Sequence, residues 1–222
     1  VPMIVICGQV PTSMIGTDAF QEAPVPALMG SVAKHIFLVT DPHQLEATVR
    51  TAFEIARTGR SGPVVIDVPK DVQNWSGTFQ GEGVLPIPGY RKRLFAVTHA
   101  AVEDDEAAEF FDMLREARRP LIYAGGGVVN SGASAVLTEF ATEFGIPVVT
   151  TLMGIGAFDT THRLSMRMLG MHGAAFANYA VEDCDFLLAV GARFDDRVAG
   201  VPDKFAPHAR RIAHFDIDPA EI

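Results

Sequence analysis

The sequence predicts an α/β protein whose second half is a doubly wound parallel sheet and whose first half is part of another α/β domain. Short apolar segments rich in β-branched residues alternate with helical patterns along most of the 222 residues. Glycine-rich loops directly follow several predicted strands, which is typical of parallel sheets that bind ligands beyond their carboxyl ends. A stretch crowded with glycine and proline separates the two regions.

The first region contains three predicted strands and one well-delimited helix. The strands cover PMIVICG (2–8), IFLVT (36–40) and PVVIDVP (63–69). Asp41 followed by Pro42 supplies an N-cap and a first-turn proline, apolar residues then recur at helical spacing, and Gly59 is placed to end the helix. Strands separated by such a helix are expected to pair in parallel.

A connecting segment follows the first region. Residues 74–99 show neither helix nor strand periodicity, and turn-forming residues crowd the stretch at Gly77, Gly81, Gly83, Pro86, Pro88 and Gly89. The predicted organisation is therefore a first domain at residues 1–74, a linker at 75–100 and a second domain at 101–222.

The second region resumes the alternation of helices and strands. Helices are predicted at residues 103–117, 133–144 and 174–181. Strands are predicted at PLIYA (120–124), IPVVTT (146–151), DFLLAVG (185–191) and RIAHFDI (211–217). This order predicts a doubly wound sheet with a ligand crevice at the carboxyl ends of its strands.

Composition argues against several classes of function. The net charge is −9 and the longest basic run is Arg91, Lys92 and Arg93, so no nucleic-acid partner is expected. No apolar run approaches the roughly 18 residues of a membrane helix, so no membrane association is expected. Cys7 and Cys184 lie far apart without metal-ligand spacing, so neither a disulfide framework nor a metal site is predicted.

Three consecutive glycines, Gly125, Gly126 and Gly127, directly follow the strand at 120–124. Their missing side chains would let a phosphate or nucleotide approach the backbone. However, the run is not the full G-x-G-x-x-G fingerprint, and a tight strand-to-helix turn accounts for three glycines equally well. Both interpretations stay open.

The loops TLMGIG, GARFDDR and DID follow the later predicted strands, and MLGMHG precedes the helix predicted at 174–181. If these loops meet at one crevice, Arg193 would pair with a pyrophosphate and Asp216 would accept hydrogen bonds from a ribose or an adenine. Alternatively, Arg193 belongs to a surface ion-pair cluster with Asp195, Asp196 and Arg197. The joint placement of the loops favours nucleotide binding.

Two further residue types in these loops are candidates for a cofactor site. His172 would serve as a general base, a metal ligand or a polar lining residue; no carboxylate lies at helical ligand spacing from it, which argues against the metal role, and a cofactor contact is favoured. Met153, Met168 and Met171 would form an adaptable apolar wall for a flat ring system, although methionines at such positions are also typical of plain core.

The first region holds an irregular polar string, GQVPTSMIGTDAFQE (8–22). It contains no Ser-His-Asp or Cys-His set, so the residues alone indicate a binding loop, and Asp18 with Glu22 would equally cap and charge a helix start. Lys70, which follows the third strand, would meet an anionic substrate or form a surface ion pair with Asp71.

Together these strings resemble the large catalytic subunit of acetolactate synthase (acetohydroxyacid synthase), a thiamine-diphosphate-dependent family with three α/β domains. The strings that occur in the family's order are GQVP, IGTDAFQE, GPVVIDVPKD, the glycine triplet, TLMGIG, MLGMHG, ANYAVEDCD, GARFDDRVAG and HFDIDPAEI. IGTDAFQE with RFDDRV is highly specific. The resemblance implies an internal fragment that holds the latter part of a pyrimidine-binding domain and a Rossmann-like, FAD-binding central domain truncated at its C-terminal end.

The resemblance also implies roles for individual residues. Phe20 and Gln21 are placed near the thiamine and the substrate, and Lys70 is placed at the mouth of the substrate channel. Pro11, Asp196 and Arg197 are placed along that channel. The implied FAD contacts are Arg60, Gly126, Thr151, Leu152, Leu169, Gly170, Met171, His172, Gly191, Ala192, Arg193, Phe194, Asp195, Asp216 and Ile217.

The implied reaction joins two pyruvates into 2-acetolactate with loss of CO2, or pyruvate with 2-oxobutyrate, in branched-chain amino-acid biosynthesis. Thiamine diphosphate with Mg2+ is the implied electron sink, while FAD is mainly structural. The resemblance places the thiamine anchors outside these residues, so the fragment alone is expected to be inactive. It also implies small 2-oxo acid substrates, a homodimer or tetramer with or without a small regulatory subunit, and a bacterial cytoplasmic or plant plastid location.

Two alternative functions fit parts of the same pattern. Another thiamine-diphosphate carboligase or decarboxylase, such as glyoxylate carboligase, would share the fold, but IGTDAFQE argues against it. A non-catalytic nucleotide-binding module would leave the region before the linker unexplained. The product formed from pyruvate discriminates between these readings.

Overall fold

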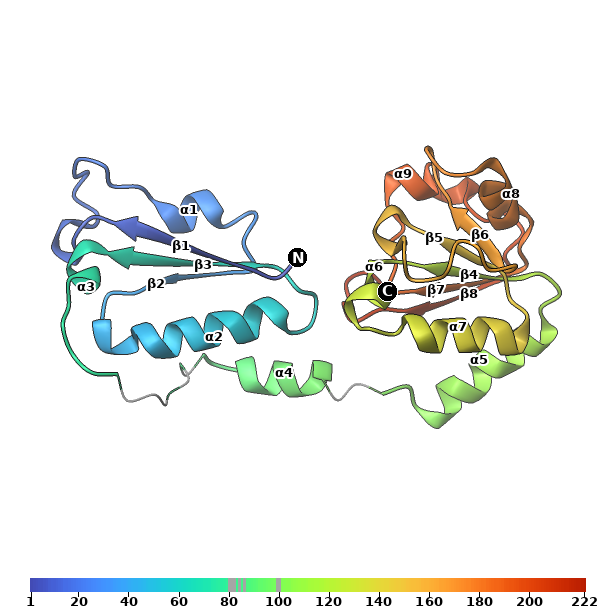
Figure 1. Cartoon of the computed structure of the whole chain (residues 1–222), viewed down its shortest axis with the longest axis horizontal. Helices are drawn as coiled ribbons and strands as arrows, with labels where there is room; N and C mark the ends of the chain where they lie inside the picture. Colours follow the sequence, from blue (N-terminus) through green and yellow to red (C-terminus); the bar gives the residue numbers. More distant parts are fainter. Residues whose placement is uncertain (80–82, 84, 86, 99–100) are drawn as a thin grey trace. The chain divides into compact units, whose positions relative to one another are not determined.

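A computed structural model describes residues 1–79, 83, 85, 87–98 and 101–222, and the chain divides into two compact units, Val1–Ala100 and Ala101–Ile222 (Figure 1). Each unit is built on one parallel sheet. Gly81 and Pro86 of the predicted linker lie outside the described residues. None of the described helices is long and apolar enough to cross a membrane.

The first unit has a three-stranded parallel sheet in the order β1-β3-β2. Its strands are β1 (Met3–Gln9), β2 (His35–Leu38) and β3 (Pro63–Pro69). Its helices are α1 (Val25–Met29), α2 (Leu45–Arg57), α3 (Lys70–Gln73) and α4 (Tyr90–Thr98), with 3-10 turns η1 (Thr12–Met14) and η2 (Pro42–Gln44). β1 and β3 pair along their whole length, so the ends of these two strands lie side by side.

Helix α2 follows the predicted pattern closely. Asp41 accepts a hydrogen bond from the His43 N–H (3.0 Å) and caps the turn η2, from which α2 continues. The buried face of α2 packs on β3 in one apolar cluster that includes Ala52 and Ile55. At the other end Lys34 Nζ donates to the carbonyl of Ile55 (2.6 Å), which satisfies one of the free carbonyls of the last turn.

Helix α4 lies in the segment where the sequence showed neither periodicity, so the structure corrects that expectation for Tyr90–Thr98. No residue of α4 is buried. Because the helix buries no face, its apolar residues form no distinct stripe, and the sequence pattern does not reveal it. The helix is held to α2 by an ion pair between Arg91 and Glu54 (2.8 Å).

The second unit has a five-stranded parallel sheet in the order β6-β5-β4-β7-β8. The strands are β4 (Pro120–Ala124), β5 (Val148–Thr150), β6 (Ser165–Met168), β7 (Phe186–Val190) and β8 (Arg211–Phe215). Four of them confirm predicted strands, whereas β6 was missed. Its sequence SMRM has no apolar run, Arg167 has a left-handed backbone (φ 61°), and its pairing with β5 is interrupted by a register shift.

Helices cover both faces of this sheet (Figure 1). They are α5 (Asp104–Glu116), α6 (Gly126–Asn130), α7 (Ser134–Phe144), α8 (Ala175–Asp183) and α9 (Asp196–Ala199), with 3-10 turns η3 (Leu152–Gly154) and η4 (Pro202–Lys204). The three long helices confirm the predicted ones. The short helices α6 and α9 lie inside segments that were predicted as loops.

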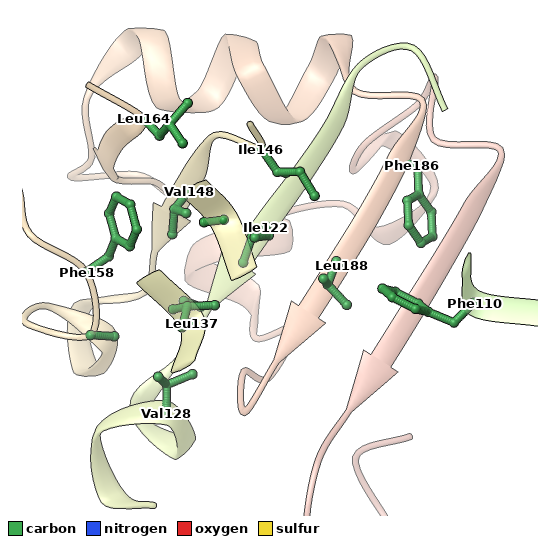
Figure 2. Close-up of a cluster of buried hydrophobic side chains, with 13 residues drawn as sticks. Phe110, Ile122, Val128, Leu137, Ile146, Val148, Phe158, Leu164, Phe186 and Leu188 are labelled. Carbon is green, nitrogen blue, oxygen red and sulfur yellow. The ribbon is translucent and has the colours of Figure 1, made fainter. Parts of the chain in front are cut away.

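Two apolar clusters bury the two faces of the five-stranded sheet, as a doubly wound fold requires. Figure 2 shows the first cluster, in which Phe110 of α5 lies toward Phe186 and Leu188, and Leu137 of α7 belongs to the same group. The second cluster joins α8 to the opposite face through residues such as Val181. The predicted fold class is confirmed.

Candidate functional site

All five strands of the second unit run parallel, so their carboxyl ends meet at one edge of the sheet. The loops that leave this edge begin at Gly125, Thr151, Leu169, Gly191 and Asp216. The chain moves outward from β4 to β5 and β6 and then returns to β7, so the strand order reverses between β4 and β7. Ligand crevices form at such a switch point. The structure thus brings the four predicted loops and the glycine triplet to one edge.

The glycine triplet crosses the loop after β7 at very short range. A Cβ atom on Gly125 would lie 2.1 Å from the Gly191 carbonyl oxygen, and one on Gly127 would lie 2.6 Å from Gly191 Cα. The Gly127 N–H also donates to the Gly191 carbonyl (2.9 Å). Gly125 and Gly127 therefore serve the contact between two loops, which is the tight-turn interpretation. A Cβ on Gly126 would lie 3.0 Å from Met153 Cβ, so this position also faces protein.

Two side chains of the sheet, the buried Tyr123 and the largely buried His214, hold the loop after β7. The Tyr123 hydroxyl donates to the Arg193 carbonyl (2.8 Å), and His214 Nε2 lies 2.9 Å from the Ala192 carbonyl and thus acts as its donor. The Phe194 ring packs between the two rings, with centroid distances of 5.5 Å to Tyr123 and 5.3 Å to His214. Consecutive carbonyls are therefore turned inward, and the backbone of residues 191–195 is fixed.

The loop after β6 is held by a side-chain amide. Asn178 of α8 accepts from the Gly170 N–H (2.8 Å) and donates to the Gly170 carbonyl (3.1 Å). Gly170 needs this support because its backbone is left-handed (φ 98°). The next residue, Met171, donates its N–H to the Arg197 carbonyl (3.1 Å) and joins this loop to the one after β7.

Sequence reasoning missed Tyr123, His214 and Asn178, because they lie within strands and a helix rather than in loops. The available signal was a polar side chain inside an apolar element, since a buried polar atom must find a partner. Burial, and then the negative charge of Asp195, raise the pKa of Tyr123 well above its usual range. Its hydroxyl therefore stays protonated and keeps donating.

The charged residues after β7 do not form the ion-pair cluster that was the alternative interpretation. Arg197 Nε lies 3.7 Å from Asp196 Oδ2 in an exposed pair, which is a weak interaction. Asp195 instead caps α9 by accepting from the Arg197 N–H (3.0 Å). Arg193 is exposed and forms no salt bridge with any residue in the described part of the chain. Its guanidinium is available to an anionic ligand.

Large apolar side chains are exposed along the same edge. The exposed fractions are 69% for Leu152, 70% for Met153, 65% for Met171 and 53% for Ile217. Such a group beside polar loops indicates a surface that a ligand or partner covers. Met168, by contrast, lies in β6 and is partly buried, so it is less available to a ligand than Met153 and Met171.

Several predicted FAD contacts already have partners. Leu169 and Ala192 are buried, so only their backbone groups are available to a ligand. The Thr151 hydroxyl accepts from the Gly154 N–H (2.8 Å). Asp216 Oδ1 accepts from the Asp218 N–H (2.9 Å), which leaves mainly its other oxygen, 4.0 Å from His214 Nε2. His172, in contrast, is exposed.

In the first unit the polar string forms a loop at the carboxyl edge of its sheet. Thr12 donates its N–H (2.9 Å) and hydroxyl (2.5 Å) to the Asp71 carboxylate, which ties the loop beside Pro11 to the end of β3. Phe20 is 89% exposed, and Gln21 has a left-handed backbone (φ 67°).

Lys70 lies at the same edge and is exposed. The Asp71 carboxylate is engaged by Thr12, and Lys70 forms no salt bridge with any described residue. The surface ion pair that was the alternative interpretation of Lys70 is therefore not present. Arg60 precedes β3 and lies at the amino-terminal edge of this sheet, so within the first unit it is not grouped with Lys70 or Phe20.

A metal-binding cluster and a phosphate-binding pocket are two further kinds of site to consider among the described residues. Within residues 1–79, 83, 85, 87–98 and 101–222, no three His, Cys, Asp or Glu side chains gather as a metal-binding group. An open hollow of about 740 Å³ lies between α7 and residues 156–159, which follow β5. It is lined by the carboxylates of Glu139, Glu143 and Asp159 and by no basic residue, so it is poorly suited to a phosphate-bearing ligand.

A doubly wound parallel domain with its loops gathered at a topological switch point defines a class of nucleotide-binding α/β domains. The family described as "Thiamine pyrophosphate enzyme, central domain" matches residues 107–222. The chain belongs to this family of thiamine pyrophosphate enzymes, and residues 107–222 are its central domain.

Within that family the chain is similar to acetolactate synthases. It is 50% identical to the acetolactate synthase large subunit of Parasynechococcus marenigrum and 47% identical to that of Corynebacterium glutamicum, in each case over 100% of this chain. It is 46% identical to the chloroplastic acetolactate synthase of Arabidopsis thaliana, also over 100% of this chain. The chain spans 35%, 34% and 32% of these three relatives, or about a third of their length.

A solved structure supports the fold alone. A Mycobacterium smegmatis protein described as a candidate thiamin diphosphate-dependent enzyme matches with a TM-score of 0.67 at 24% identity. The match covers 87% of this chain and 36% of that protein.

Proposed function

We propose that this chain is part of an acetolactate synthase, which joins two pyruvates into 2-acetolactate and CO2, or joins pyruvate with 2-oxobutyrate. The observation that carries the proposal is identity of 46–50% over the whole chain with relatives of that name from different organisms. Because the chain spans about a third of those relatives, the activity is proposed for the whole protein rather than for these residues alone.

The carboxyl edge of the second unit is proposed to hold FAD. Three observations support the fit of this group. Arg193 offers a guanidinium without a salt bridge to the described residues, which suits a pyrophosphate. Met153 and Met171 expose polarisable apolar surface that suits a flat ring. The backbone of the loops after β6 and β7 is held rigidly by Asn178, Tyr123 and His214.

The loop after β1 is proposed to face the reacting 2-oxo acids. Thiamine diphosphate, bound with Mg2+, supplies the electron sink for loss of CO2. The exposed ring of Phe20 would exclude water, which favours forming a carbon–carbon bond over protonation. The Gln21 amide would hold an oxygen of the substrate. Lys70, at the same edge, would attract the carboxylate of the incoming 2-oxo acid, with Pro11 along its path.

The assembly and location follow from the same proposal. A homodimer or tetramer is proposed for the whole protein, with a small regulatory subunit as a further partner. The proposed location is the cytoplasm of a bacterium or the plastid of a plant. Light scattering of the purified protein, with and without a candidate regulatory subunit, tests the assembly.

The activity is tested in a protein of the relatives' full length that contains this chain. With pyruvate, thiamine diphosphate, Mg2+ and FAD it should release CO2 and accumulate 2-acetolactate, at two pyruvates consumed per CO2. Glyoxylate offered in parallel should give no condensation product. A protein that binds thiamine diphosphate and consumes glyoxylate, but forms no acetolactate from pyruvate, would contradict the proposal.

The FAD site is tested by flavin fluorescence with the 222-residue chain. Arg193→Ala should weaken FAD binding about tenfold, the factor expected for loss of one charge-assisted hydrogen bond. Arg118→Ala is the matched control, since Arg118 is exposed and precedes β4 at the opposite edge of the same sheet. Equal weakening in both variants would argue for nonspecific charge attraction and against the assigned site.

A further inference from the structure

The loop between β1 and α1 has an unfavourable backbone. Asp18 (φ 59°) and Gln21 (φ 67°) are both non-glycine residues in the left-handed region, and Gly16 (φ 83°) is a third left-handed position. Non-glycine residues adopt this conformation only where the surroundings impose it. Phe20 cannot impose it, because its ring is 89% exposed and packs on little of the protein.

The Glu22 carboxylate supplies one constraint. Its Oε1 accepts from the Gly16 N–H (2.5 Å) and its Oε2 accepts from the Ala19 N–H (3.1 Å). Both oxygens of one side chain therefore reach back along the loop and close it around Asp18. The Gly16 N–H, followed by weaker backbone contacts, lowers the pKa of Glu22, so the carboxylate is ionised and a strong acceptor at neutral pH.

Two further carboxylates hold the ends of the loop. Asp71 accepts two hydrogen bonds from Thr12 and fixes the start of the loop to the end of β3. The buried Asp67 accepts from Gln9 Nε2 (3.1 Å), and the same nitrogen donates to the Ala23 carbonyl (2.7 Å). Gln9 thereby joins the first and last turns of the loop.

We propose that Glu22, assisted by Asp71, is a positioning residue that holds Phe20 and Gln21 in the orientation needed for 2-oxo acid condensation. This proposal rests on the proposed function. The Glu22 carboxylate binds the N–H groups of Gly16 and Ala19, and Phe20 and Gln21 lie between Ala19 and Glu22 in the chain. They are therefore held within a closed turn as long as both hydrogen bonds are formed. Without the carboxylate, only one of the described hydrogen bonds, from the Glu22 N–H to the Ala19 carbonyl (2.9 Å), still closes this turn, so the left-handed residues relax more easily and the exposed ring is held less firmly.

The positioning role is tested first by amide hydrogen exchange on the 222-residue chain. Glu22→Ala should speed exchange of the Gly16 and Ala19 amides about tenfold, while Glu22→Gln, which keeps one acceptor oxygen, should speed it only about threefold. Asp18→Asn is the matched control, because the Asp18 carboxylate accepts no hydrogen bond from the described residues and Asn tolerates a left-handed backbone. Asp71→Asn should speed exchange at Thr12 while leaving Ala19 protected.

Two exchange results would overturn the proposal. One is equal protection of Gly16 and Ala19 in the wild-type chain and in Glu22→Ala. The other is faster exchange throughout β3 in that variant, because Glu22 would then support the whole unit rather than orient one loop.

The consequence for the reaction is tested in the full-length protein. Glu22→Ala should lower kcat for acetolactate about tenfold while the KM for pyruvate stays within about twofold, and Glu22→Gln should recover most of the rate. A faster-exchanging loop with unchanged kcat would overturn the positioning role. If the unaltered protein forms no acetolactate, the proposed function fails, and the exchange data still decide whether Glu22 holds the loop.

Discussion

The two sheet edges hold their loops by different means. In the second unit the loop after β7 is fixed by Tyr123 and His214 of the sheet and by the crossing of Gly127 with Gly191, and the loop after β6 is fixed by Asn178 of α8. In the first unit the loop after β1 is fixed by exposed carboxylates that bind its own amides.

This comparison shows that a loop at a site can be held rigid in two ways, which differ in how strongly a mutation affects the stability of the whole unit. Backbone crossings and buried neutral hydrogen bonds are part of the core, so changing them costs folding stability as well as local order. Exposed charge-assisted hydrogen bonds contribute little to global stability but fix a local conformation. The first kind suits a bound structural cofactor, and the second suits residues that are proposed to meet successive substrates.

The largest effect is expected where the two loops of the second unit cross. Gly127→Ala should destabilise this unit by at least about 3 kcal/mol, because the new Cβ would lie 2.6 Å from backbone that cannot move freely. Gly132→Ala is the matched control: Gly132 is also left-handed (φ 72°), but nothing lies within 4 Å of a Cβ there, so about 1–2 kcal/mol is expected.

Urea unfolding can assign that effect to one unit. The single tryptophan, Trp75, lies in the first unit, so its fluorescence follows that unit, while circular dichroism follows both. A loss in Gly127→Ala no larger than in Gly132→Ala would mean that the crossing is not a tight constraint.

A smaller effect is expected at the buried hydroxyl. Tyr123→Phe should destabilise the second unit by about 1–2 kcal/mol, because the Arg193 carbonyl loses its donor. It should also weaken FAD binding about threefold, since the loop from 191 to 195 becomes less ordered. Tyr179→Phe is the matched control, because Tyr179 is 64% exposed. If Tyr123→Phe binds FAD as tightly as the wild type, the hydrogen bond from Tyr123 to the Arg193 carbonyl does not contribute to cofactor binding.

The amide clamp on Gly170 should have a comparable but more local effect. Asn178→Ala removes both hydrogen bonds, whereas Asn178→Asp keeps an acceptor for the Gly170 N–H and loses the donor. Loss of unfolding free energy of about 1 kcal/mol is expected for the alanine variant, with less for aspartate. Amide exchange at Gly170 in both variants measures the ordering directly, and unchanged exchange in Asn178→Ala would show that backbone hydrogen bonds hold this loop without Asn178.

The extent to which the fold follows from the sequence depends on burial. Strand β3 and helix α2 were predictable because burying a face dictates the spacing of their apolar residues. β6 was not, because its polar–apolar alternation covers only four residues, SMRM, and its pairing with β5 at the sheet edge is interrupted by a register shift. Helix α4 was missed because it buries none of its residues.

For the candidate site of the second unit, the location could be predicted from the sequence but the residues that hold its loops could not. Its location followed from parallel topology, because loops after parallel strands must share an edge. Its anchors did not, because the contact of Tyr123 with Arg193 joins residues 70 apart and depends on the register of β4 against β7. The carboxylate contact between Thr12 and Asp71 likewise spans 59 residues. Neither contact leaves a local pattern in the sequence.

The smallest and most selective effect is expected from acid. The pKa values of Glu22 and Asp71 are lowered, chiefly by the Gly16 N–H and the Thr12 hydroxyl respectively. A lowered folded-state pKa means that the stabilisation is present above the unfolded value, about pH 4, and is lost as the pH falls through the folded value. Amides of Gly16 and Thr12, corrected for intrinsic rates, should therefore lose protection only below about pH 4.

The same titration can show whether the loss of protection in acid depends on the unit in which an amide lies or on the carboxylate that binds the amide. The Gly170 amide, held by the neutral Asn178 side chain, should keep its protection over this range. Thr161 in the second unit is the matched comparison, because its N–H binds the Asp159 carboxylate (2.8 Å), whose pKa that contact lowers. Thr161 should lose protection together with Gly16, although it lies in the unit with buried anchors. If Thr161 instead stays protected with Gly170, the acid response belongs to the first unit as a whole and not to carboxylates that hold amides.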